Sequence, residues 1–228
     1  MGNKIKLTAS DGHNLTAYRA EPTGTPLGTV VVVQEIFGVN SHIQSVADGY
    51  ASAGYLAIAP ALFDRVKPDM ELGYEGDDVT VGREAAFPLG WDAPLMDINA
   101  AIEVGSGETN RKVAVVGYCW GGSLAYLAAC ESNVNCAVGY YGGQILKILD
   151  AKPKLQVQAP VMLHFGENDT GIPLTDVDQI KSKHPDVPVH LYDAGHGFNC
   201  DQRASFSEPA AKLALERTLE FFSKHMAG

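Results

Sequence analysis

Residues 113–129 read VAVVGYCWGGSLAYLAA, an order that predicts a strand, a sharp turn and a helix. An apolar run opens the segment, Cys119 stands between Gly117 and Gly121, and a run typical of a helix follows. A strained turn residue needs small neighbours, which accounts for the glycines two positions before and after the cysteine. The segment therefore predicts a nucleophile elbow with a thiol at its tip.

The position of Cys119 bears on its reactivity. A helix N-terminus presents unpaired N–H groups and the positive end of the helix dipole, and both favour a thiolate over a thiol. Free cysteines are, however, often simply buried. The motif alone leaves two interpretations open, a nucleophile and a tight turn with an inert cysteine.

The composition is that of an acidic globular domain. The chain has 228 residues, 46% of them hydrophobic, with a formal net charge of −10 and a pI near 5.1. Basic tracts and basic amphipathic helices are missing from the sequence, so we expect no nucleic-acid and no membrane partner. Residues 1–7 alternate like a strand rather than resembling a signal peptide, and no run approaches the roughly 20 apolar residues of a membrane span.

The spacing of cysteines and histidines predicts neither disulfides nor a metal site. Cys119, Cys130, Cys136 and Cys200 form no Cys-x-x-Cys pair, and the histidines, His42 among them, lack ligand spacing. We interpret the other histidines as surface or packing residues, and expect no metal and no cofactor. A reducing cytoplasm fits this pattern best, with the chain as a monomer or weak dimer.

Strand and helix patterns alternate along the chain. A hairpin is expected at 4–8 and 15–20, joined through Asp11-Gly12. Apolar runs predict strands at 29–33, 55–60, 113–116, 136–139, 161–165 and 187–191, and helices at 41–53, 123–129 and 209–222. A further helix from about residue 93 is expected to lead through Gly105-Ser106-Gly107 to the strand before Cys119. Strands that are apolar on both faces predict an α/β fold, a mostly parallel doubly wound sheet with helices on both faces, in a single domain over residues 1–228.

Three polar residues follow predicted strands directly. Ligands bind beyond the carboxyl ends of strands in such sheets, where Cys119, Asp169 and His196 are expected. The order nucleophile, acid, histidine is that of an α/β-hydrolase triad. We therefore predict that Cys119 attacks, His196 exchanges the proton and Asp169 orients the imidazole. Taken singly, Asp169 also fits a capping carboxylate and His196 a surface histidine.

Glu35 occupies a fourth strand end. A carboxylate between an apolar strand and Ile36-Phe37 should have a partner, since an unpaired buried charge is costly. A structural ion pair with an arginine is the simpler alternative to a functional role. The loop after this strand supplies an oxyanion-hole donor in the hydrolase architecture, which predicts the amides of Ile36 and Trp120 as the two donors.

The motifs together resemble the dienelactone hydrolase (carboxymethylenebutenolidase) family from the first strands to the last helix. The residues that carry the resemblance are 34–38, 117–122, 137–142, Asp169, 194–196 and 216–219. The resemblance implies that the cysteine, aspartate and histidine form the triad, and that Glu35 holds the resting thiol and helps to ionise it. It also implies hydrolysis of the enol-lactone ring of a dienelactone to maleylacetate, although relatives use other esters.

The sequence departs from the family pattern after the histidine. Family enzymes that act on dienelactone have an arginine four residues beyond it to hold the substrate carboxylate, whereas this chain has Cys200 there. Arg203 and Arg83 are the candidate replacements, with solvated surface residues as the alternative. Tyr140, after a strand, is a candidate substrate contact or a core residue. The long segment 63–91 predicts a substrate-facing cap or an irregular surface excursion.

The resulting expectation is a cysteine-dependent hydrolase of lactones or activated carboxylic esters. Its partner would be a small-molecule lactone or ester. The alternative is a non-catalytic or regulatory binding protein on the same scaffold, because a fold does not fix a function.

Overall fold

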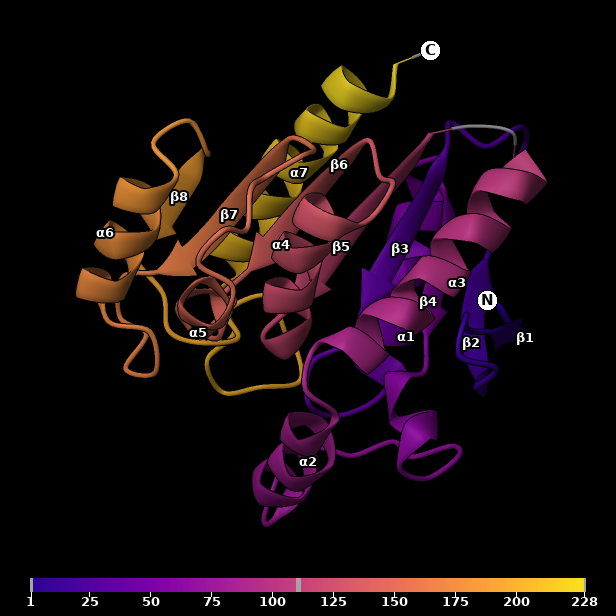
Figure 1. The fold of residues 1–228 in the computed structure, drawn as a ribbon, viewed down its shortest axis with the longest axis horizontal. Helices are drawn as coiled ribbons and strands as arrows, with labels where there is room; N and C mark the ends of the chain where they lie inside the picture. The colour runs from indigo at the N-terminus through magenta and orange to yellow at the C-terminus, as the bar shows by residue number, and fades with distance from the viewer. Residues whose placement is uncertain (1, 110–111, 228) are drawn as a thin grey trace.

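The strands form one eight-stranded sheet in the order β1-β2-β4-β3-β5-β6-β7-β8 (Figure 1). The computed structural model describes residues 2–109 and 112–227. The strands are β1 (Asn3–Thr8), β2 (Asn14–Ala20), β3 (Thr29–Val33), β4 (Leu56–Pro60), β5 (Val113–Tyr118), β6 (Cys136–Tyr140), β7 (Val161–Gly166) and β8 (Val189–Tyr192). The β1–β2 and β2–β4 pairs are antiparallel and all others parallel, which confirms the predicted α/β class and its mostly parallel sheet.

Helices cover both faces of the sheet. α3 (Asp92–Thr109) and α4 (Trp120–Glu131) pack on one face, and α1 (Ser41–Ser52) and α7 (Glu208–Met226) on the other (Figure 1). Tyr50 of α1 and Phe222 of α7 meet with ring centroids 5.9 Å apart. The central strands β3 and β5 are buried along their whole length, as their apolar sequences predict.

Helix α3 extends further than the sequence predicts. We expected a connection at 105–107, but the helix continues to Thr109. The reason is close packing, because a Cβ at Gly105 would lie 2.4 Å from the Thr29 side chain, and the Thr29 hydroxyl donates to the Gly105 carbonyl at 3.0 Å. Gly105 therefore allows α3 to pack closely against β3, and it does not mark a turn of the chain.

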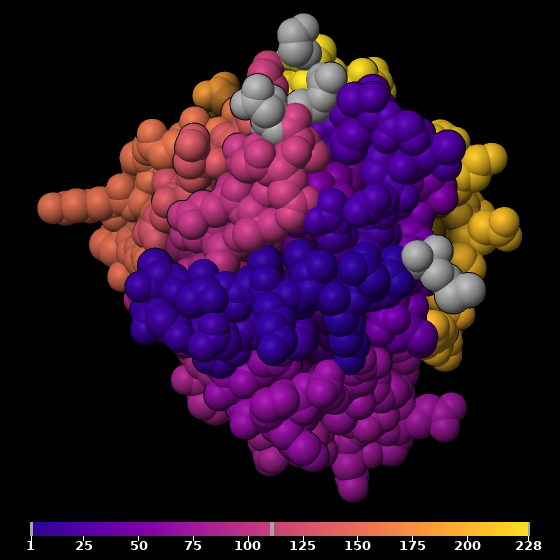
Figure 2. Space-filling view, turned by 90° about the vertical axis from the view of Figure 1, so that its right-hand side faces the viewer, coloured from indigo at the N-terminus to yellow at the C-terminus, as the bar shows by residue number. Residues whose placement is uncertain are grey.

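The segment 63–91 lies beyond the carboxyl ends of the parallel strands. It holds the end of a 3-10 turn at Leu62–Arg65, the helix α2 (Asp78–Ala86) and a second 3-10 turn at Phe87–Leu89. In Figure 1 α2 projects below the sheet, and Figure 2 shows this part of the chain as a lobe beneath the N-terminal hairpin. The remaining α-helices are α5 (Ile145–Ala151) and α6 (Leu174–Lys183). None of the helices in the described residues is long and apolar enough to span a membrane.

Candidate active site

Cys119 stands at the tip of the turn between β5 and α4 with φ 54° and ψ −116°. A non-glycine residue in this region is strained and persists only where its surroundings enforce it. The neighbouring glycines allow the turn, because a Cβ at Gly117 would lie 1.9 Å from the Gly121 carbonyl oxygen, and one at Gly121 would lie 2.4 Å from that of Gln34. The second contact also packs the turn against the loop that follows β3.

The three predicted triad residues meet at this turn. The Nε2 atom of His196 lies 3.1 Å from the Sγ atom of Cys119, and its Nδ1 atom donates to the Asp169 Oδ2 atom at 2.7 Å. The other oxygen of Asp169 accepts from the amides of Gly171 at 2.8 Å and Ile172 at 3.1 Å. The carboxylate is thus held in one orientation, and it fixes the tautomer that presents Nε2 to the sulfur.

The electrostatics of this cluster favour a protonated imidazole. Burial lowers the pKa of His196, but the Cys119 sulfur and the Asp169 carboxylate outweigh it and raise that pKa from 6.5 to about 10. The arrangement therefore favours the imidazolium form of His196 beside the sulfur.

A cavity of about 500 Å³ opens over the sulfur. It is lined by Cys119 and His196, by Val79, Arg83 and Phe87 of the segment 63–91, and by Arg203 and Lys147 among other groups. Lys147, on α5, was not predicted from the sequence, since nothing in its local pattern distinguishes it from a solvated surface lysine. The cations give the cavity a positive wall.

Ile36 and Trp120, whose amides are the predicted oxyanion-hole donors, both line this cavity. Trp120 is the first residue of α4, so its N–H has no helical acceptor. Neither amide donates a backbone hydrogen bond within the described chain. The oxyanion-hole prediction requires two amides without a backbone acceptor, and in the described residues these two have none.

Glu35 is fully buried behind the cavity. Its carboxylate accepts from the Tyr74 hydroxyl and the Arg203 guanidinium, each at 3.4 Å. The resemblance implied that Glu35 holds the resting thiol. In the structure the Cys119 sulfur instead contacts the Nε2 atom of His196. Arg203 does reach the site, and its guanidinium also lies 5.7 Å from the Phe37 ring centroid.

Tyr140 does not contact the cavity, so the prediction of a substrate contact is wrong. The residue is fully buried, and its hydroxyl is 2.7 Å from the Thr218 hydroxyl. Successive side chains of a strand point to opposite faces, and the next residue, Tyr141, packs edge-on against His196 with ring centroids 5.1 Å apart. Tyr141 takes the unusual φ of 38° as the chain leaves β6.

Comparison with known proteins decides the family. The model of the dienelactone hydrolase family matches residues 15–226. The chain belongs to the dienelactone hydrolase family. Carboxymethylenebutenolidase of Pseudomonas putida is 34% identical over 230 residues, 96% of this chain and 95% of that protein. Carboxymethylenebutenolidase 1 of Cupriavidus pinatubonensis is 31% identical over 232 residues, 98% of this chain and 97% of that one.

Solved structures agree with this family. A candidate dienelactone hydrolase of Klebsiella pneumoniae superposes with a TM-score of 0.81 at 29% identity, covering 98% of this chain and 99% of that one. The dienelactone hydrolase of Anabaena variabilis, at 18% identity, shares the fold with a TM-score of 0.71 over 99% of this chain and 98% of that one. The family resemblance seen in the sequence is confirmed, and this dienelactone hydrolase family member is a carboxylic ester hydrolase with an α/β-hydrolase fold.

Proposed function

We propose that this hydrolase uses Cys119 as its nucleophile to cleave lactones or activated carboxylic esters. The observation that carries the proposal is the chain of contacts from the Cys119 sulfur to His196 at 3.1 Å and from His196 to Asp169 at 2.7 Å. In this assignment His196 transfers the proton, and Asp169 orients the imidazole ring of His196.

The reaction begins when the thiolate attacks the ester carbonyl. The oxyanion forms within reach of the amides of Ile36 and Trp120, and each such donor contributes about 10²–10³-fold to rate. The intermediate collapses to a thioester on Cys119 and an enolate or alkoxide leaving group, which takes the proton of His196. An enolate is a good leaving group, so it needs little protonation to depart.

Acylation also prepares the second half of the reaction. The sulfur loses its charge in the thioester. Because Cys119 makes the largest contribution to raising the His196 pKa, that pKa falls when the thioester forms. The neutral imidazole can then take a proton from water, which attacks the thioester and releases the acid and the thiolate. One histidine serves as acid and then as base because its partner changes charge.

The positively charged side chains on the cavity wall favour an anionic substrate. Arg83, Lys147 and Arg203 line the cavity, so we propose an ester or lactone that carries a carboxylate, with dienelactone and its product maleylacetate as the first pair to test. A substrate carboxylate at Arg203 would compete with Glu35 for the guanidinium, and the released Glu35 could then assist ionisation of the thiol. We assign the segment 63–91 as the cap over this substrate.

A kinetic screen tests the proposal. Wild-type protein should release chromophore from an activated aryl ester in a burst, and Cys119→Ala should lose at least about 10⁴-fold in kcat. Cis- and trans-dienelactone should be turned over by the wild type, with a raised KM in Arg83→Ala and Arg203→Ala. Lys181→Ala, an α6 surface control, should match the wild type. A binding protein on this scaffold would show neither burst nor turnover.

The cellular compartment and the assembly state are also proposed. All four cysteines are free, which fits a reducing compartment such as the cytoplasm. Assembly as a monomer or weak dimer is a prediction that light scattering over a range of concentrations would check.

A further inference from the structure

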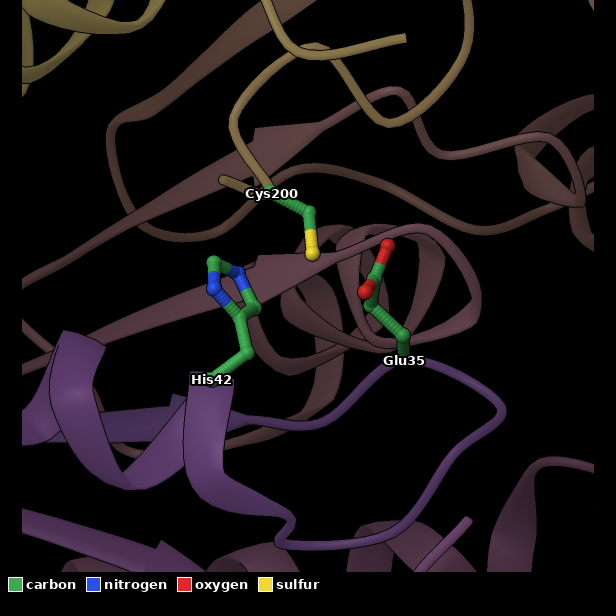
Figure 3. Close-up of side chains that lie close together, drawn as sticks. All are labelled: Glu35, His42 and Cys200. Carbon is green, nitrogen blue, oxygen red and sulfur yellow. The ribbon is translucent and has the colours of Figure 1, made fainter. Parts of the chain in front are cut away.

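Three buried side chains lie close together (Figure 3). They are Glu35 from the loop after β3, His42 from the first turn of α1 and Cys200 from the loop after β8. One ligand atom of each lies within 4.8 Å of those of the other two. Carboxylate, imidazole and thiolate are the donor types that zinc takes in proteins.

His42 carries the first independent sign of a ligand. Its side chain is 3% exposed, and its Nδ1 atom lies 3.1 Å from the Asp201 carboxylate. A carboxylate can only accept, so in the neutral imidazole Nδ1 carries the hydrogen and Nε2 keeps a lone pair. That Nε2 atom is buried and has no hydrogen-bond partner among the described residues. A buried acceptor without a partner is costly unless something binds it.

Glu35 has acceptor capacity to spare. Its contacts with Tyr74 and Arg203 are both 3.4 Å long, whereas charge-assisted bonds to a carboxylate are usually about 2.7–2.9 Å. A carboxylate offers about four lone-pair sites. The present contacts leave room for a stronger partner.

We propose that Glu35, His42 and Cys200 bind one zinc ion. Ligand atoms around tetrahedral zinc lie about 3.4–3.8 Å apart. The three ligand atoms lie within 4.8 Å of one another, so zinc binding needs a contraction of at most about 1.4 Å. Small side-chain rotations supply this movement. Cys200 gives its proton to solvent as the zinc–sulfur bond forms, and the fourth position is open to water.

The surroundings match those of a metal ligand set. Metal-bound histidines usually donate their other N–H to a carboxylate, and Asp201 accepts that hydrogen from His42. Arg203 near Glu35 is a cation, but the charges balance. The carboxylates of Glu35 and Asp201 and the Cys200 thiolate oppose zinc and the guanidinium. The acyl-transfer steps at Cys119 do not involve this site, although Glu35 is shared with the proposed ionisation step.

The test uses Co²⁺ as a spectroscopic probe in Cys119→Ser protein, because the triad cysteine and histidine could themselves hold a metal. One equivalent of Co²⁺ should give a near-ultraviolet thiolate-to-cobalt absorption, which Zn²⁺ then displaces. Adding Cys200→Ser should abolish the absorption. Adding Cys136→Ser, a buried cysteine at the start of β6, should leave it intact, with melting curves showing that each variant is folded.

Asp201→Asn gives a second test that does not disturb the core, since Asp201 is 61% exposed. It should weaken Co²⁺ binding about 10–100-fold, whereas the surface control Asp186→Asn should not change it. The proposal is overturned if no near-ultraviolet absorption appears, if it survives Cys200→Ser, or if Asp201→Asn binds as tightly as Asp186→Asn.

Discussion

The guanidinium of Arg203 lies 3.4 Å from the carboxylate of Glu35, a residue 168 positions earlier in the chain. The pair joins the loop after β8 to the loop after β3 at the wall of the cavity. It also gives the buried Glu35 its only ion pair within the described residues.

Loss of Arg203 should therefore destabilise the fold through Glu35. We expect Arg203→Met to lower the free energy of unfolding by about 1–3 kcal/mol, because a buried carboxylate loses its partner. The double variant Arg203→Met/Glu35→Gln should recover most of the loss. Urea unfolding of the single and double variants measures this coupling, and a double variant no more stable than Arg203→Met would refute it.

Gly82 tests the contact between helix α2 and the loop after β3, which carries the proposed oxyanion-hole donor Ile36. A Cβ there would lie 1.9 Å from the Ile36 carbonyl oxygen, so Gly82→Ala must push α2 or the Ile36 peptide out of place. We expect a reduced kcat and no gain in stability. Gly49→Ala in α1 is the matched control, because nothing lies within 4 Å of its added methyl. That variant should gain about 0.5–1 kcal/mol from helix propensity and keep full activity. Equal activity in both variants would show that α2 does not position the donor.

The His196 pKa should depend on the sulfur. Among the groups that raise the His196 pKa to about 10, Cys119 has the largest effect. Cys119→Ser should therefore lower this pKa, while the contact between His196 and Asp169 persists. Protonation of the wild-type imidazole should accordingly last until the pH passes through about 10. NMR titration of the ring protons measures both values. An unchanged pKa in Cys119→Ser would mean that the sulfur carries no charge at the pH of the measurement.

Arg65, near the start of the segment 63–91, forms a buried ion pair with Asp97. Its Nε and Nη2 atoms donate to the two oxygens of Asp97 at 2.7 and 2.8 Å, and Asp97 is fully buried. Arg65→Met should lower stability by about 3–5 kcal/mol, since it strands the carboxylate. Arg65→Met/Asp97→Leu should restore much of it. Thermal unfolding checks the pair, and equal melting temperatures for the single and double variants would contradict this account.

The sequence predicted the sheet and the meeting of the triad because both depend on regular patterns. Apolar runs fixed the strands, and the carboxyl ends of parallel strands share an edge, so Cys119, Asp169 and His196 had to approach one another. The end of α3 was missed, because the fit of Gly105 against Thr29 is a tertiary contact. Local patterns carry no such information.

The rest of the site depends on loop conformation. Tyr140 and Tyr141 are adjacent, and only the backbone at the end of β6 decides which of them reaches His196. Likewise, the turns after His196 bury Cys200 and return Arg203 to Glu35. His42 joins Cys200 although its neighbours in the sequence give no ligand spacing.

The most direct test of the central claim is to locate the acyl group during turnover. Wild-type protein quenched in the burst phase with an activated aryl ester should gain the mass of one acyl group, and peptide mapping should place it on Cys119. Cys119→Ala should show neither adduct nor turnover. An adduct on another residue, or turnover of Cys119→Ala at the wild-type rate, would contradict the assignment of Cys119 as the nucleophile.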